Sequence, residues 1–339
     1  MIKDSVYDLV TDDVFLRFPD VLPGSELHLK IEGLNPAGSV KLKTAVGLIE
    51  DAERRGLLSP GGRVVESSSG NLGVALAMVC AAKDYAFTCV TDVNAAPHNV
   101  ALMRALGASV AVVDKRDAGG GFLGTRIAHI QRMLADDPLL VWPNQYANPA
   151  NPEVHETRTA AAILAALGNV DFLFVGAGTT GTLTGCATYF RRVSPHTRII
   201  AVDTLGSVTF GTAAGPRHIP GLGTSRVPEI CRPDLVDEVV LVEETEAVRT
   251  CRMLARRHGL LAGGSTGTVF TAVQRAAPDI PPGSRVVALA PDMGERYLAT
   301  VYDDDWVAAR FGIDPTLPAV EALTRPQSPE KETPCSRSM

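Results

Sequence analysis

The sequence predicts an α/β fold in which two open parallel sheets enclose a cleft. Two observations carry this prediction. Short β-branched segments alternate with amphipathic helical segments along most of the 339 residues, a pattern typical of parallel sheets covered on both faces. A chain of this length can also bury a large core divided between two lobes. Such folds bind ligands where strands end and helices begin.

The expected elements follow from composition and periodicity. Strands are predicted at Arg63–Glu66, Phe87–Thr91, Ser109–Val113, Leu139–Trp142, Phe172–Val175, Arg198–Val202, Val239–Val242 and Arg285–Leu289. Helices are predicted after Lys41 and at Leu72–Lys83, Asn99–Leu106, Gly124–Leu134, Thr157–Leu167, Thr182–Arg192, Glu246–Arg257 and Thr268–Ala276. The alternation stops at Ile313, and the proline-rich, polar residues 313–339 are predicted to form a disordered tail.

Composition excludes several classes of function. The net charge is −6, and no run of Lys and Arg interleaved with aromatics favours nucleic-acid binding. No apolar stretch approaches the roughly 20 residues of a membrane helix, and the N-terminus lacks the apolar core of a signal peptide. The six cysteines form no C-x-x-C pair, so no metal site is expected and reduced thiols in a cytoplasmic protein are the plain interpretation.

Two loops between a strand and a helix carry polar donors. In Glu66–Gly73 three serines and Asn71 converge at a helix N-terminus, which suits a carboxylate, although an ordinary serine N-cap is the alternative. Gly176–Thr182 combines glycines with threonine hydroxyls and is a candidate phosphate cup. It lacks the Gly-Lys-Ser/Thr ending of a nucleotide P-loop. The alternative to a phosphate site is an ordinary tight βα turn with no ligand.

A third loop and a lysine complete the pattern. Leu260–Gly267 precedes a helix and on its own predicts only capping by Ser265 or Thr266. The stretch Asn35–Lys41 places Lys41 at a turn where a helical pattern begins. A desolvated lysine there can lose its proton and form a Schiff base with pyridoxal phosphate. The phosphate cup would then anchor this cofactor, and Ser265 could meet its pyridine nitrogen.

Taken together, these motifs resemble the fold type II (tryptophan synthase β-like) family of pyridoxal-phosphate enzymes, specifically the cysteine synthase and cystathionine β-synthase group. The resemblance runs from about Val14 to about Arg310. Its markers are Asn35–Lys41, Glu66–Gly73, Asn144–Pro149, Gly176–Thr182, Ile219–Gly223, Ala262–Gly267 and Pro291–Tyr297. The family implies β-replacement on an activated L-serine.

By position, the resemblance assigns roles to individual residues. Lys41 is the expected Schiff-base lysine and proton carrier, and Asn71 the partner of the ring hydroxyl. Ser265 takes the place of the serine at the ring nitrogen. A neutral hydroxyl does not hold that nitrogen protonated, so the ring is expected to be a weak electron sink. The phosphate cup comprises Gly176, Gly178, Thr179, Thr180, Gly181 and Thr182.

Two departures separate the chain from plain cysteine synthases. Those enzymes usually read Thr-Ser-Gly-Asn-Thr-Gly where this chain has Leu72 after Asn71, and Lys-Asp-Arg where it reads Lys41-Leu42-Lys43. The serine loop is instead similar to synthases of the staphyloferrin B type. Those enzymes make N-(2-amino-2-carboxyethyl)-L-glutamate from O-phospho-L-serine and L-glutamate. A partner NAD-dependent dehydrogenase then yields L-2,3-diaminopropionate, a building block of siderophores and peptide antibiotics.

Binding two anionic substrates requires further donors. Arg126 and Tyr146 resemble that subfamily, although Arg126 could be a solvated helix residue and Tyr146 a core residue. Gln145 is expected at a substrate carboxylate, whereas Arg217, His218 and Arg296 are candidates with ordinary structural alternatives. The substrate-binding set is Ser68, Ser69, Gly70, Arg126, Gln145 and Tyr146.

The resemblance also implies domain organisation. Residues 42–147 are expected to form a smaller mobile domain, and residues 1–41 with 148–312 a larger domain that anchors the cofactor. Relatives are usually homodimers. The alternatives left open are a cysteine synthase-like enzyme that uses acetylserine or phosphoserine with sulfide, and a catalytically silent scaffold.

Overall fold

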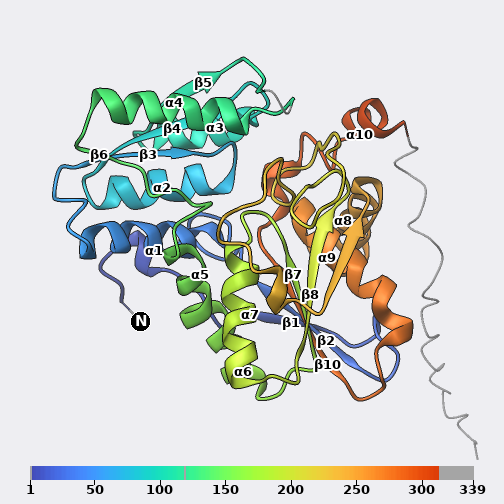
Figure 1. Ribbon diagram of the computed structural model, residues 1–339. Coiled ribbons are helices and arrows are strands. Elements are labelled where there is room, and N and C mark those ends of the chain that lie inside the picture. The colour runs from blue at the N-terminus through green and yellow to red at the C-terminus, as the bar shows by residue number, and fades with distance from the viewer. Residues whose placement is uncertain (1, 118–119, 313–339) are drawn as a thin grey trace, which may run out of the picture.

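Two sheets, each covered by helices on both faces, make up the part of the chain that the computed structural model describes, residues 2–117 and 120–312. The smaller sheet belongs to the N-terminal half and the larger one mainly to the C-terminal half (Figure 1). The expected alternation of strands and helices is therefore confirmed. The predicted tail, 313–339, lies outside the described residues.

The smaller sheet has four parallel strands in the order β5-β4-β3-β6. Its strands are β3 (Arg63–Ser67), β4 (Ala86–Asp92), β5 (Ser109–Val113) and β6 (Leu140–Val141). Its helices are α1 (Lys41–Arg54), α2 (Asn71–Ala82), α3 (Pro97–Ala105) and α4 (Leu123–Asp136). One face packs on α1 and α2 and the other on α4, which explains why β3 and β4 are apolar on both sides.

The larger sheet has six strands in the order β1-β2-β10-β7-β8-β9. Its strands are β1 (Phe15–Phe18), β2 (Glu26–Ile31), β7 (Phe172–Gly176), β8 (Arg198–Thr204), β9 (Glu238–Val242) and β10 (Arg285–Ala290). Its helices are α5 (Ala150–Val154), a π-helical turn (His155–Ala160), α6 (Ala161–Leu167), α7 (Gly181–Val193), α8 (Glu244–His258) and α9 (Gly264–Ala276). The α6–α7 layer and the α8–α9 layer bury opposite faces.

Several elements were not predicted, among them β1, β2, α5 and α10. β1 pairs antiparallel with β2 at one edge, so the larger sheet is not purely parallel. Strand β2 was missed because polar His28 and Lys30 interrupt its apolar pattern, yet Lys30 is fully buried in the structure. A short helix, α10 (Asp304–Phe311), follows the last strand and is capped by the Asp303 side chain.

Parallel pairing brings the carboxyl ends of β2, β7 and β10 to one edge of the larger sheet. β3 of the smaller sheet likewise leads directly into the serine loop and α2. The turns that carry the predicted motifs therefore lie where ligands bind in this class of fold.

Candidate active site

The candidate active site is built where the phosphate cup, the serine loop and the start of α9 meet. Gly178 in the cup lies so close to the Ile219–Gly223 loop that a Cβ there would be 2.5 Å from the Gly221 carbonyl oxygen. Gly221 in turn packs against the Ser265 side chain at the start of α9. The glycines of the cup are thus needed for close backbone approach.

Lys41 is the first residue of α1 and is half-buried. The preceding residue, Val40, donates its N–H to the Pro291 carbonyl at 2.7 Å, which ties the start of α1 to the end of β10. Burial lowers the pKa of the Lys41 ammonium to about 8, and the Asp292 carboxylate opposes that decrease. Close to neutral pH a useful fraction of Lys41 is therefore an unprotonated nucleophile.

Asp292 joins the residues expected to hold the cofactor ring. It is 1% exposed; Asn71 Nδ2 donates to its Oδ2 at 2.7 Å and Ser265 Oγ donates to its Oδ1 at 3.1 Å. The Tyr297 hydroxyl also donates to Oδ2. Asp292 belongs to the Pro291–Tyr297 motif, but its role was not predicted, although an aspartate at the end of a buried strand was an available signal.

The orientation of the Asn71 amide is fixed from both sides. Arg296 can only donate, and its guanidinium binds Asn71 Oδ1, so Nδ2 must face Asp292. Arg296 also donates to the Ala37 carbonyl and so links Asn71 to the lysine loop. One Asn71 N–H is left for a ligand, and Arg296 acts here as a structural clamp.

The phosphate cup is supported from the helix beneath it. Asn151 Nδ2 donates to Thr179 Oγ1 at 3.2 Å, and His155 Nε2 lies 3.3 Å from Thr182 Oγ1 and 3.0 Å from Thr44 Oγ1 on α1. Burial, Lys41 and Lys43 hold the pKa of His155 well below its usual value, so the ring is neutral. His155 thus ties the cup to the lysine helix.

Thr180 has an unusual backbone conformation at the N-terminus of α7. Its φ is 65°, in the left-handed region that β-branched residues avoid. Its buried hydroxyl lacks an oxygen or nitrogen partner among the described residues, with the Cys231 thiol beside it. A strained residue whose buried hydroxyl has only a thiol beside it is typical of a ligand-binding turn.

The serine loop combines capping with an open face. Ser68 Oγ accepts from Gly73 N at 3.0 Å, so the capping alternative holds for this serine. Ser69 and Gly70 are half-exposed. Glu66 supports the loop from below by accepting from Ser67 N and the Trp142 indole, and burial raises its pKa to about 7.

Gln145 and Tyr146 lie beside this loop. Gln145 Nε2 donates to the Ser67 carbonyl at 2.8 Å, so the side chain braces the serine loop, and its Oε1 and second N–H are left for a ligand. The Tyr146 side chain is half-buried, and burial raises the pKa of its phenol while Arg126 opposes that rise. Gln145 therefore supports the serine loop, and Tyr146 lies within electrostatic range of Arg126.

Arg126 is buried on α4, with 8% of its surface exposed. Its Nε lies 3.5 Å from Asp92 Oδ2 at the carboxyl end of β4 and makes no hydrogen bond to the described residues. The solvated-helix alternative is thus excluded. Arg217 instead donates to the Gly206 and Thr224 carbonyls, and the side chain of His218 is exposed.

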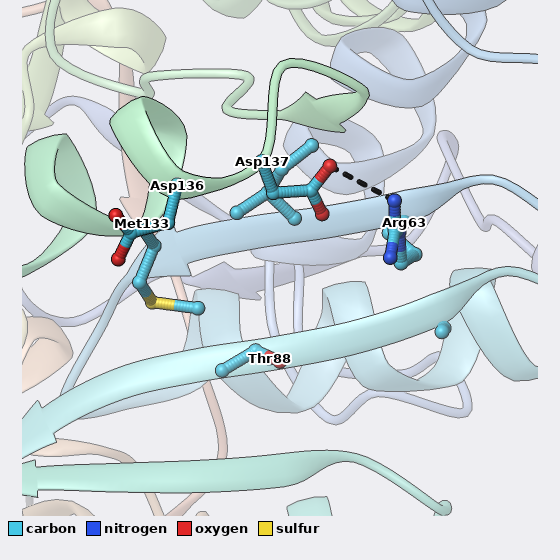
Figure 2. A pocket seen from close by; sticks show the side chains of 7 residues that line it. Arg63, Thr88, Met133, Asp136 and Asp137 are labelled. Carbon is cyan, nitrogen blue, oxygen red and sulfur yellow. Dashed lines mark hydrogen bonds and ion pairs between the residues drawn. The ribbon is translucent and has the colours of Figure 1, made fainter.

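A separate hollow lies at the amino ends of β3 and β4 (Figure 2). Arg63 and Asp137 close one side of it with an ion pair of 2.9 Å. The serine loop leaves β3 at its opposite, carboxyl end. This hollow therefore does not belong to the candidate active site.

The donors at the site fit pyridoxal phosphate. The N-cap residue of α7, Thr180, makes no side-chain capping hydrogen bond, and that of α9, Gly263, has no side chain, so N–H groups at both helix starts are available to an anion. Lys41 supplies the amine and Asn71 a ring-hydroxyl partner. No cluster of metal-ligating side chains occurs among the described residues, and none of their helices is long and apolar enough to cross a membrane.

Proteins similar in sequence to this chain include two synthases that share one name. N-(2-amino-2-carboxyethyl)-L-glutamate synthase of Ralstonia nicotianae is 43% identical over 311 residues, which cover 91% of this chain and 92% of that protein. The synthase of the same name from Cupriavidus metallidurans is 43% identical over 303 residues, covering 88% and 89%.

Structural comparison agrees on the architecture. O-ureido-L-serine synthase is 33% identical with a TM-score of 0.82, covering 91% of this chain and all of that one. The O-acetylserine dependent cystathionine β-synthase of Helicobacter pylori is 30% identical with a TM-score of 0.81, covering 88% and 98%. A family model described as pyridoxal-phosphate dependent enzyme matches residues 14–292. The chain therefore belongs to the family of pyridoxal-phosphate dependent enzymes and has the fold type II architecture expected from its sequence.

Proposed function

We propose that this enzyme joins O-phospho-L-serine to L-glutamate, giving N-(2-amino-2-carboxyethyl)-L-glutamate and phosphate. The supporting observation is 43% identity, over 91% of the chain, to a synthase named for that product. In this reaction the Cβ–O bond to phosphate breaks and a bond forms from Cβ to the glutamate nitrogen. The proton removed from Cα is returned at the end, so no oxidant or reductant is needed.

Pyridoxal phosphate, when bound, supplies the electron sink that makes the substrate Cα proton acidic. The chain supplies the rest. Lys41 Nζ, with its lowered pKa, is suited to take the Cα proton and give it back. Ser69 and Gly70, half-exposed at the start of α2, are proposed to bind the donor carboxylate.

The acceptor is proposed to bind near Arg126 and Tyr146. Glutamate brings two carboxylates, and the buried guanidinium of Arg126 is proposed as a charged donor for one of them. Asp92 beside it limits the net positive charge, so Arg126 acts through directed hydrogen bonds rather than through a broad field. Tyr146, whose phenol lies within electrostatic range of Arg126, is proposed to offer a second donor.

A substrate panel analysed by mass spectrometry tests the proposal. Purified enzyme with pyridoxal phosphate is given phosphoserine or acetylserine, each paired with glutamate, other amines or sulfide. The expected result is the glutamate adduct from phosphoserine, lost in Lys41→Ala. Robust cysteine formation without that adduct would instead establish the cysteine synthase-like alternative, and full turnover by Lys41→Ala would remove Lys41 from the mechanism.

Four wider proposals accompany this function. The enzyme is a cytoplasmic homodimer whose smaller domain, residues 42–147, closes over substrates against residues 1–41 and 148–312. A close approach of Gly121 to the Ser225 side chain gives one contact between these two units. The product requires oxidation to release diaminopropionate, so an NAD-dependent dehydrogenase is expected downstream.

A further inference from the structure

We propose that Asn151 is a positioning residue that aims the Thr179 hydroxyl at the cofactor phosphate and holds Gln145 in register with it. Asn151 is the second residue of α5 and is fully buried. It acts through Thr179 in the phosphate cup and through Gln145 beside the serine loop. One side chain thereby joins the phosphate site to the site expected for the donor carboxylate.

The orientation of the Asn151 amide follows from its partners. The backbone carbonyl of Gln145 can only accept a hydrogen bond, and its oxygen lies 2.8 Å from the amide nitrogen Nδ2. The same nitrogen donates to Thr179 Oγ1 at 3.2 Å. The two amide protons are therefore committed to two fixed partners that belong to different loops.

Thr179 has one hydroxyl proton, and the contact with Asn151 decides where that proton goes. Because Oγ1 accepts from Asn151, its own proton is left for another neighbour. No acceptor for it occurs among the described residues, and only 8% of Thr179 is exposed. An anion in the cup is the partner that such an oriented donor fits.

The start of α7 is shaped to close onto the Asn151 amide. A Cβ on Gly181 would lie 2.1 Å from Asn151 Oδ1, so a larger residue there would displace the amide. Oδ1 is buried and accepts no hydrogen bond from the described part of the chain. An unpaired buried acceptor is costly, and the placement of the two amide donors explains why it is tolerated here.

The second contact of Asn151 fixes the backbone of Gln145. The Gln145 N–H donates to Glu66 Oε2 at 3.1 Å, and its side chain donates to the Ser67 carbonyl at 2.8 Å. With its carbonyl held by Asn151, the residue is bound on three sides and is 4% exposed. Its remaining amide atoms are thus fixed before a ligand enters. This arm rests on the proposed function, in which the donor carboxylate binds beside the serine loop.

The phosphate arm is tested on the apoprotein by titration with pyridoxal phosphate and with pyridoxal, which lacks the phosphate. Absorption of the Schiff base measures both affinities. Asn151→Ala should lower the preference for pyridoxal phosphate over pyridoxal by about 10- to 100-fold, the range of one hydrogen bond to a charged group. The affinity for pyridoxal itself should be unchanged. An unchanged preference, or an equal loss of both affinities, overturns the proposal.

A double-mutant cycle shows whether Asn151 acts through Thr179. Thr179→Val keeps the size of the side chain without its hydroxyl and should lower the preference by a similar factor. Adding Asn151→Ala should then cost little more, because both changes remove the same donor. Independent, additive losses would contradict the proposal, as would a wild-type preference in Thr179→Val.

Asn148→Ala is the matched control. The Asn148 amide lies three residues earlier and binds the Ala150 N–H at 2.9 Å and the Pro143 carbonyl at 3.1 Å. Its loss should lower stability in urea unfolding and leave the preference for pyridoxal phosphate unchanged. A loss of preference equal to that of Asn151→Ala would show a general loosening of this turn and would overturn the proposal.

The Gln145 arm is tested in the holoenzyme at saturating cofactor. The affinity for O-phospho-L-serine is compared with that for O-phosphoethanolamine, which lacks the carboxylate. Asn151→Ala should reduce the preference for phosphoserine, whereas Thr179→Val should keep it; a wild-type preference in Asn151→Ala overturns this arm. A wild-type enzyme that does not bind phosphoserine would overturn the proposed donor, while the phosphate arm, measured without substrate, would stand.

Discussion

The cofactor side and the acceptor side of the site are built differently. On the cofactor side, Asn71, Ser265 and Arg296 form a closed hydrogen-bonded web around Asp292. On the acceptor side, Arg126 has an unsatisfied Nε and lies 3.5 Å from Asp92. The first is fixed before any ligand enters, whereas the second has donor capacity to spare. Cofactor chemistry is therefore set by the scaffold, and acceptor choice by a few side chains on α4 and beside the serine loop.

The largest test of this contrast uses two lysines two residues apart on α1. Lys41 faces the site, whereas Lys43 is fully buried and binds Glu32 and Asp12, each at 2.7 Å. Lys41→Met should keep the fold but lower turnover by about 10³-fold or more, because the nucleophile and proton carrier are lost. Turnover and the visible Schiff-base absorption measure this effect.

Lys43→Met is the matched control. Removing Lys43 from this buried cluster leaves Glu32 with only Lys30, 3.7 Å away, and should cost up to about 3–5 kcal/mol of unfolding free energy. Urea unfolding measures that loss, while any folded fraction should still form the Schiff base. A stable Lys43→Met protein without Schiff-base absorption would show that both lysines belong to the chemistry.

The next effect concerns Glu66, a buried carboxyl that accepts hydrogen bonds from Ser67 in the serine loop and from the Trp142 indole. Burial raises its pKa to about 7 from an ordinary 4.5. Protonation therefore favours the folded state: this stability is fully present below pH 4.5 and is lost as pH rises through 7. The loss amounts to up to about 3 kcal/mol. Urea unfolding between pH 4.5 and 8 should show this slope in the wild type and a flatter one in Glu66→Gln; equal slopes would contradict it.

The two sides also differ in how far sequence could predict them. Lys41, Asn71 and Ser265 belong to contiguous motifs, and each lies at a helix start as expected. Asn71 and Ser265 are linked through Asp292. Because Asp292 lies 221 residues from Asn71 in the sequence, no local pattern reveals this link. Strand β2 was not predicted for a related reason. The burial of Lys30 depends on Glu32 and on the Asp12 carbonyl, which lies elsewhere in the chain.

The acceptor side gives a more specific prediction. Arg126→Ala should lower kcat/KM for glutamate by about 10- to 100-fold, the range of one charged hydrogen-bond donor. Formation of the Schiff base and elimination of phosphate from phosphoserine alone should be unchanged. Arg217→Ala is the comparison, because that residue donates to backbone carbonyls and should instead lower stability. Equal loss of both half-reactions in Arg126→Ala would indicate a folding role.

The smallest expected effect separates stability from function within the phosphate cup. Thr180 has φ of 65°, and such strain costs about 1–3 kcal/mol. Glycine removes the strain but adds about 0.5–1 kcal/mol of unfolded-chain entropy. Strain dominates, so Thr180→Gly should stabilise the apoprotein by about 1 kcal/mol in urea unfolding.

Thr179→Gly, at the neighbouring position, relieves no such strain and breaks a hydrogen bond to Asn151, so it should destabilise the protein. If the Thr180 hydroxyl binds the ligand phosphate, Thr180→Gly should also weaken pyridoxal phosphate binding, measured by titration of the apoprotein. If Thr180→Gly gained stability and kept full affinity for pyridoxal phosphate, the strained backbone of Thr180 would not serve phosphate binding. The closed cofactor side would then carry a constraint that serves another part of the reaction.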